Sequence, residues 1–324
     1  MTKRPLVSIG MPVYNGESCI GEAIASVLAQ TYTDMEIVIC DNCSTDKTQE
    51  ACMQYAAGDG RIRYFRYPDH TDSPTNFFRA LNRARGEFFM WACADDIRPP
   101  DSVDNLMAVL LKNPHAVMAH GQIVAKAIQS TKLIANQMQL KADGPKERIR
   151  EFAQRFVHNA MIYGMYKTEF LKRAVFKLKY GRDYHLCLQM CLFGPVEYCA
   201  KPMIILSERS LHPTDDAMGS GRPVTVRNVL RGERADRKVW MTLLYGCRYL
   251  LRHSEVSLTR RLRCLYVFGS TFVARYRGRL MRDAILLVSF PIGWTLSWGW
   301  WIARHSSILL AVGRKLKGKV YNAS

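Results

Sequence analysis

Short apolar runs alternate with helix-like stretches over the first 125 residues of the chain. The apolar runs that predict buried strands are residues 6–11, 36–40, 62–66, 87–93 and 116–124. Between them, apolar side chains recur at helical spacing, and the helices so predicted are residues 18–29, 47–57, 74–84 and 100–111. Strands that alternate with crossover helices at this pitch predict an α/β fold with a mainly parallel central sheet.

The chain turns polar directly after three of the predicted strands. The three polar loops are Pro12–Gly16, Asp41–Asp46 and Asp95–Asp96. Right-handed crossovers bring the carboxyl ends of parallel strands to one edge of a sheet, where α/β folds bind ligands. Adjacent carboxylates at such an edge repel each other, and a divalent cation relieves this repulsion because it prefers carboxylate oxygens. Taken alone, however, the acid pair favours a capped turn before a helix.

Several of these segments, taken in order, resemble the start of a bacterial-type family-2 glycosyltransferase. The matching segments are residues 7–16, 30–31 and 36–46, followed by Asn76, Gly86 and Ala94–Asp95–Asp96. The resemblance covers residues 5–215 and implies the GT-A fold, in which a Rossmann-like sheet binds a nucleotide-sugar. It also implies a divalent metal on the diphosphate of that donor and inversion at the anomeric carbon.

The resemblance assigns four residues to the nucleotide-binding side. Pro12 and Tyr14 match the first-strand loop that lies against the base, and Asp41 and Asn42 match the pair of acids that meets the base and the ribose. Asn42 stands where the family commonly has a second Asp, which weakens the expectation of uracil as the base. A turn-forming role is the alternative for Asp41.

The loops hold no glycine-rich phosphate cradle, so the resemblance points to a metal, Mg²⁺ or Mn²⁺, on the donor phosphates. Asp95 is expected near the ribose and the metal, and Asp96 is expected to ligate the metal. Cys93 occupies the place of the first acid in the family's Asp-x-Asp-type motif, so only the adjacent pair is present. Downstream, Arg209 matches a residue that neutralises phosphate charge, and His212 matches a metal ligand or, alternatively, is a loop residue.

The middle of the chain is expected to supply the acceptor side. Residues 159–166 resemble the family's strand that enters this side, and Asp183 precedes an apolar helix predicted for residues 186–192. In the family, an acid at the start of this helix is the general base. Direct displacement at an anomeric carbon needs the acceptor hydroxyl to lose its proton as it attacks, which is the role expected of Asp183. The alternative is a helix-capping acid.

The composition changes in the last third of the chain. The formal net charge is +18, and residues 222–283 hold fifteen Arg or Lys against four acids. Residues 284–303 carry no charge over about the length of a membrane span and contain four of the six tryptophans. A basic region beside an apolar, Trp-rich segment favours an anionic membrane surface over nucleic acid, with monotopic or re-entrant insertion. A single C-terminal span and a buried helix in a homo-oligomer interface are the alternatives.

We therefore expect two regions. Residues 1–215 form the GT-A domain, with a nucleotide-sugar half at 1–125 and an acceptor half at 126–215. Residues 216–324 form a basic, helical, membrane-associating region. The ten cysteines lack the spacing of a secreted disulfide framework, which favours a reducing compartment.

The expected activity is metal-dependent, inverting transfer of a hexose from a UDP-sugar to a hydroxyl of a saccharide acceptor, in cell-surface polysaccharide or glycan assembly. The acceptor is expected to be a saccharide or a polyprenyl-linked saccharide. The expected place is the cytoplasmic face of the inner (plasma) membrane. A catalytically silent membrane scaffold with the same fold is the alternative, and the intact acids Asp95, Asp96 and Asp183 argue against it.

Overall fold

A computed structural model describes the chain in seven stretches: residues 5–127, 130–134, 138–156, 159–174, 182–206, 236–252 and 256–289. The chain divides into two compact units, residues 1–276 and 277–324, and the central sheet belongs to the first. The predicted boundary after residue 215 lies outside the described residues and stays a prediction. Most of the predicted membrane segment, from residue 290 onward, also lies outside them.

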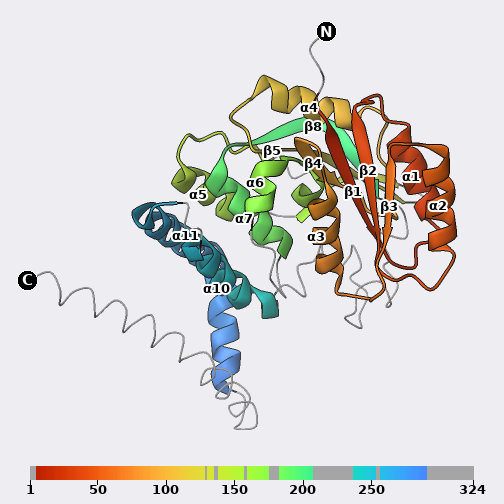
Figure 1. The fold of residues 1–324 in the computed structure, drawn as a ribbon. Helices are drawn as coiled ribbons and strands as arrows, with labels where there is room; N and C mark the ends of the chain where they lie inside the picture. Colours follow the sequence, from red (N-terminus) through yellow and green to blue (C-terminus); the bar gives the residue numbers. More distant parts are fainter. Residues whose placement is uncertain are drawn as a thin grey trace, which may run out of the picture. The chain divides into compact units, whose positions relative to one another are not determined.

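The described part of the chain is built on an eight-stranded sheet with the order β3-β2-β1-β4-β7-β5-β6, in which β8 pairs with β5. Figure 1 labels β1 to β5 and β8 of this sheet. The strands are β1 (Val7–Val13), β2 (Met35–Asp41), β3 (Ile62–Arg66), β4 (Phe88–Trp91), β5 (Met118–Ala127), β6 (Ser130–Ile134), β7 (Met165–Lys167) and β8 (Val196–Leu206). Only β6 and β7 run against the common direction of the other strands. The predicted mainly parallel α/β sheet is confirmed.

Helices connect the strands as the sequence predicts. The helices are α1 (Ile20–Leu28), α2 (Thr48–Gly58), α3 (Ser73–Arg83), α4 (Ser102–Lys112), α5 (Pro145–Arg155), the 3-10 helix η1 (Asn159–Tyr163), α6 (Thr168–Arg173), α7 (Arg182–Phe193), α10 (Asp236–Arg252) and α11 (Leu258–Ser289). None of the helices among the described residues is both long enough and apolar enough to cross a bilayer.

Both faces of the sheet are covered. Ile37 and Ile39 of β2 belong to a large core cluster with side chains of α1, α2 and α4, whereas Val38 and Cys40 pack with Ala80 of α3. Successive side chains of a strand point to opposite faces, so a strand buried on both faces needs apolar residues at every position. This is why residues Ile37–Cys40 of β2 form an unbroken apolar run in the sequence.

The segment predicted as a strand over residues 159–166 has a different structure. It forms the 3-10 helix η1 and then the short strand β7, which is antiparallel to both β4 and β5. Gly164 separates the two elements, and a Cβ atom there would lie 2.5 Å from the Ala119 carbonyl oxygen. The backbones approach so closely at this point that only glycine fits, and regular strand pairing begins after it.

Two further elements differ from the prediction in their bounds. Helix α7 begins at Arg182, four residues before the predicted start, which places Asp183 in its first turn. The apolar runs Val196–Cys199 and Met203–Leu206 predict two short strands, but strand β8 is continuous across Pro202. The register with β5 shifts on both sides of Gln122, which pairs with Pro202, so a bulge absorbs the residue that cannot donate to the ladder.

Helices α10 and α11, up to Tyr276, pack on the acceptor half of the domain. A Cβ atom on Gly246 of α10 would lie 2.5 Å from the ring of Phe268 of α11, so the two helices meet closely there. The ring of Tyr184 on α7 lies 6.4 Å from that of Phe268 and 6.3 Å from that of Phe272, measured between centroids. This first part of the basic region is therefore packed against α7.

Candidate active site

The carboxyl ends of β1, β2 and β4 lie at one edge of the sheet. Val13 of β1 pairs with Asp41 of β2, and Gly10 of β1 pairs with Trp91 of β4. These parallel registers make the three polar loops leave the sheet side by side. The predicted convergence of the loops is confirmed.

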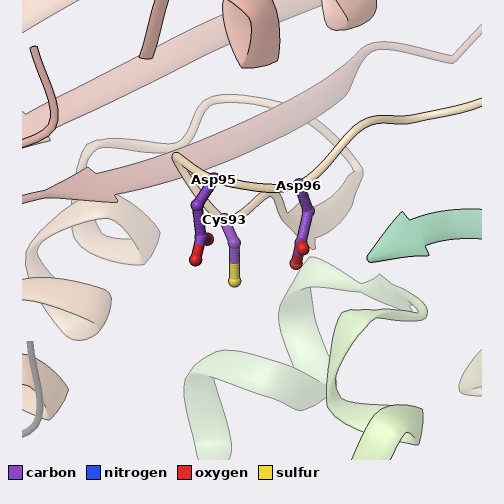
Figure 2. Close-up of side chains that lie close together, drawn as sticks. All are labelled: Cys93, Asp95 and Asp96. Carbon is purple, nitrogen blue, oxygen red and sulfur yellow. The ribbon is translucent and has the colours of Figure 1, made fainter. Parts of the chain in front are cut away.

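An acidic corner forms in the loop that follows β4. One oxygen each from Asp95 and Asp96 and the sulfur of Cys93 lie within 4.8 Å of one another, and Figure 2 shows the three side chains leaving the loop in the same direction. Asp96 is buried, while Asp95 and Cys93 are half-buried. The acid pair is thus grouped as a chelating site requires.

The thiol of Cys93 differs from the two carboxylates as a ligand. Burial raises the pKa of Cys93 well above its ordinary value of 9.0, and the negative charges of Asp96 and Asp95 raise it further. The thiol therefore stays protonated at neutral pH and is a poor ligand for a hard cation. Two carboxylate oxygens remain, which match Mg²⁺ or Mn²⁺. Of the described residues at this corner, these two acids are the ones that can hold a metal.

Arg98 lies buried beneath this corner. Its guanidinium donates hydrogen bonds to the carbonyl oxygens of Trp91, of Met203 at 3.2 Å and of Tyr163 at 3.4 Å. Burial lowers the pKa of Arg98 to about 10, while the negative charge of Asp96 opposes this fall. The side chain is therefore cationic at neutral pH, and its positive charge lies near the acid pair.

The side chain of Gln30 fixes the turn that follows the acid pair. Its amide nitrogen donates to the carbonyl oxygens of Ser26 at 3.1 Å and Pro99 at 2.7 Å. Its amide oxygen accepts from the Ser102 hydroxyl at 3.0 Å and from the Val103 backbone N–H at 3.1 Å. All four hydrogen bonds available to the amide are made, so Gln30 joins the end of α1 to the first turn of α4.

Asp41, predicted to meet the base and ribose, is fully buried at the end of β2. One carboxylate oxygen accepts the Ser44 backbone N–H at 2.8 Å, and the other accepts the Tyr64 hydroxyl at 2.7 Å. Burial and this hydrogen bond raise the pKa of Tyr64. These contacts are those of an acid that shapes the loop after β2, and contact with a nucleotide stays a prediction for Asp41.

Asn42, Tyr14 and a histidine outside the predicted site form the rim beside this loop. Asn42 accepts the Thr71 backbone N–H at 3.0 Å and donates to the Thr71 carbonyl oxygen at 2.7 Å. The ring of His70 lies 4.3 Å from the exposed ring of Tyr14, and its Nδ1 lies 3.2 Å from the Asn42 carbonyl oxygen. Pro12 differs from the prediction, because it is a buried residue of β1 rather than of the loop.

Side chains of the loop after β2 and of the first residue of α2 accept hydrogen bonds from the backbone of the loop after β1. The Asn15 N–H donates to the Ser44 hydroxyl at 3.0 Å, and the Gly16 N–H donates to the Thr48 hydroxyl at 2.8 Å. In return, the Asn15 side chain accepts the Thr45 N–H at 2.9 Å. Asn15 has a positive φ of 49°, a conformation that asparagine tolerates better than most residues.

The fold places Asp183 and Asp96 near one common side chain, that of Tyr163. Asp183 lies in the first turn of α7 and is half-buried. Tyr163 neighbours both: the adjacent Cys93 side chain, burial and the charge of Asp183 raise the pKa of Tyr163 well above its ordinary value, and the charge of Asp96 adds to the rise. The predicted base and the predicted metal ligand therefore share Tyr163 as a neighbour. Arg209 and His212 lie outside the described residues.

Three residues of this site escape the sequence patterns: His70, Arg98 and Tyr163. His70 and Arg98 lie in loops, and their partners are distant in the chain, so no spacing connects them. Tyr163 lies within residues 159–166, a segment that resembles the family's strand entering the acceptor side. That segment was the available signal for it.

A mixed sheet with acids at the ends of its parallel strands is the architecture of the GT-A glycosyltransferases, and the solved structures similar to this chain have that fold. A 1–349 fragment of TarS from S. aureus, solved in complex with UDP-GlcNAc, has a TM-score of 0.59 at 15% identity, covering 83% of this chain and 72% of that one. The mannosyltransferase PcManGT from Pyrobaculum calidifontis, solved with GDP-Man and Mn²⁺, has a TM-score of 0.54 at 17% identity, covering 97% and 81%.

Residues 8–174 match the model of glycosyl transferase family 2, and this is more than half of the chain. The protein belongs to that family, as its sequence motifs predict. An uncharacterized glycosyltransferase of Rickettsia typhi is 38% identical over 111 residues, which are 34% of each chain. The Escherichia coli enzyme WfgD, a UDP-Glc:α-D-GlcNAc-diphosphoundecaprenol β-1,3-glucosyltransferase, is 31% identical over 142 residues, or 41% of this chain and 54% of WfgD. The matches thus span about a third to a half of these relatives.

Proposed function

We propose that the protein is a metal-dependent, inverting glycosyltransferase that moves a hexose from a UDP-sugar to a hydroxyl of a saccharide acceptor. The observation that carries the proposal is the acidic corner of Asp95 and Asp96 at the convergent strand ends of a family-2 domain. The UDP-GlcNAc complex of TarS and the UDP-Glc donor in the name of WfgD support the choice of donor.

The reaction is a single displacement. The acceptor oxygen forms a bond to the anomeric carbon as the bond from that carbon to the diphosphate breaks, and UDP leaves. Asp183 takes the proton of the acceptor hydroxyl during the attack, because a free hydroxyl is a poor nucleophile. A divalent metal held by Asp95 and Asp96 would neutralise the charge that builds on the leaving diphosphate.

The acceptor that we propose is a polyprenyl-linked saccharide, met at the cytoplasmic face of the inner membrane. Two observations support this. The WfgD acceptor is named as a diphosphoundecaprenol-linked sugar, and the C-terminal third of this chain is strongly basic. A basic surface attracts anionic lipids, which would hold the enzyme where such an acceptor lies.

The test is a donor screen with the purified full-length protein, in which consumption of each nucleotide-sugar is measured with and without Mg²⁺ or Mn²⁺. We expect one UDP-sugar to be consumed only with metal. Asp96→Asn should lower the rate roughly 100-fold or more, because a metal contributes several kcal/mol to such a transition state. The matched control is Asp101→Asn, since Asp101 is an exposed acid nearby whose side chain makes no cap hydrogen bond to α4.

Two results would contradict the proposal. One is that no nucleotide-sugar is consumed with either metal. The other is an Asp96→Asn variant that turns over as fast as the wild type and as Asp101→Asn. Thermal unfolding of both variants checks that any loss is not a loss of fold.

A further inference from the structure

Helix α11 carries an exposed apolar stripe along one side. Leu258 is 57% exposed, Leu262 49%, Tyr266 76% and Val273 43%. Residues four apart on a helix lie one above the other, and seven residues make two turns, so these four side chains share one face. Gly269 continues the row, and a Cβ atom there would meet no heavy atom within 4 Å.

The stripe is not needed for packing the helix onto the domain. A different face does that, through the buried side chains Cys264, Val267, Phe268 and Phe272. An amphipathic helix of a soluble domain needs one apolar face and keeps the other polar. A second apolar face on the solvent side therefore indicates a binding partner outside the domain.

The positive charge around the stripe indicates which kind of partner it binds. Residues 256–277 contain five arginines and no acid, and Arg260 and Arg263 are exposed on the same turns as Leu262. A second copy of the chain docking through this face would place arginines against arginines. An anionic lipid surface satisfies both features, because its headgroups pair with arginine and its acyl boundary receives leucine and tyrosine.

We propose that the stripe of Leu258, Leu262, Tyr266 and Val273 is a membrane-binding face that lies in the headgroup region of anionic lipid. This inference deepens the membrane part of the proposed function and adds a contact surface outside residues 284–303. Helix α11 packs on α7 through Phe272 and Tyr184, and Tyr184 follows the predicted base in the sequence. A bound α11 thus keeps the acceptor side of the site close to the lipid.

The experiment is co-sedimentation of the full-length protein with vesicles of pure phosphatidylcholine or of phosphatidylcholine containing phosphatidylglycerol. We expect binding to the anionic vesicles that weakens with added salt. The double substitution Leu262→Gln and Tyr266→Gln should weaken this binding roughly 10-fold or more, since two apolar contacts with lipid are lost. The matched control is Leu111→Gln on α4, where the leucine is 57% exposed and lies outside the stripe.

A second measurement separates this face from any other anchor in the chain. A photo-crosslinking amino acid at position 266 should form lipid adducts on anionic vesicles, and the same group at position 111 should not. The inference is overturned if position 266 gives no lipid adduct, or if the double variant binds as the wild type does. A double variant that changes the oligomeric state by light scattering, with vesicle binding intact, also overturns it and indicates an interface between copies.

Donor turnover with a soluble acceptor is measured in the same variants. We expect the double variant to keep it, because neither side chain belongs to the candidate active site. A wild type that binds anionic vesicles through position 266 but consumes no donor would contradict the proposed activity and support the membrane face. The two proposals therefore fail separately.

Discussion

The guanidinium of Arg98 donates a 3.2 Å hydrogen bond to the carbonyl oxygen of Met203, across 105 positions of sequence. The same group bonds the carbonyl oxygens of Trp91, at the end of β4, and Tyr163, at the end of η1. One buried side chain thus joins three segments that surround the acid pair. It does so through carbonyl oxygens, while the nearby carboxylate of Asp96 offsets its charge.

Replacing Arg98 by methionine should therefore loosen the acidic corner. Each buried carbonyl oxygen left without a donor costs roughly 1–3 kcal/mol, so we expect a clearly lower melting temperature. In the folded fraction we expect weaker Mn²⁺ binding, measured by calorimetry. Arg98→Lys should recover part of the metal affinity, because it restores the charge but not the planar fork. An unchanged melting temperature and metal affinity in Arg98→Met would contradict this role.

The contact between Tyr14 and His70 predicts an effect on donor binding alone. If the two rings form one surface for the base, His70→Ala should raise the KM for the donor about 2–10-fold and leave kcat unchanged, since ring contacts contribute about 0.5–1.5 kcal/mol. The control is His115→Ala, an exposed histidine that follows α4. Equal KM values for the donor in the two variants would show that the nucleotide base does not bind against Tyr14 and His70.

Asp183→Asn separates the two roles open to this acid. A general base contributes roughly 10²–10⁴-fold, so we expect kcat for transfer to fall by that range while the KM for the donor changes little. If the acid serves only the dipole of α7, the melting temperature should fall and kcat should not. Glu169→Gln is the matched control, because Glu169 is an exposed acid in the first turn of α6.

Glu36 predicts a pH dependence of stability at the opposite edge of the sheet. Burial would raise the pKa of Glu36, but hydrogen bonds from the Ser8 hydroxyl, the Arg85 backbone N–H and the Arg63 guanidinium outweigh it and lower the pKa below 4.5. The ionised form is therefore favoured in the folded state. Its stabilising contribution is present above the unfolded pKa and is lost as the pH falls through the folded one.

Denaturant unfolding of the wild type and of Glu36→Gln at several pH values measures this effect. We expect the wild type to lose its advantage over the variant as the pH falls from about 6 to 3, because protonation then removes what the substitution removes. A constant difference in the free energy of unfolding over that range would assign the effect to packing. The exposed Glu50 of α2, changed to Gln, serves as the control.

Most of the parallel half of the sheet is predictable from the sequence, and the reason is physical. Strands β1, β2 and β4 are buried on both faces and therefore form mostly apolar runs, as at Ile37–Cys40, with turn residues after them. Strand ends are less clear, because Pro12 and Val13 still pair with β2 although they resemble the start of a loop. Segments that pair antiparallel through few residues, such as Met165–Lys167, carry no such pattern.

The candidate site likewise contains residues that the sequence predicts and residues that it does not. The acid pair and Asp183 are visible because their motifs lie in contiguous sequence, and the fold brings them to a common neighbour, Tyr163. The role of Arg98 could not be predicted from the sequence, because it depends on a hydrogen bond to Met203. Met203 comes near Arg98 only when β8 pairs with β5. The contacts of Asp41 with Tyr64 are likewise formed only when β2 and β3 pair.

The cross-bonded loops after β1 and β2 have a consequence for how a donor would bind. The backbone of Asn15 and Gly16 is held by the side chains of Ser44 and Thr48, and the Asn15 side chain holds Thr45 in return. These two loops have already lost their conformational freedom before any ligand arrives. A nucleotide that docks on them does not have to pay the entropy of ordering them, so more of its contact energy remains as affinity.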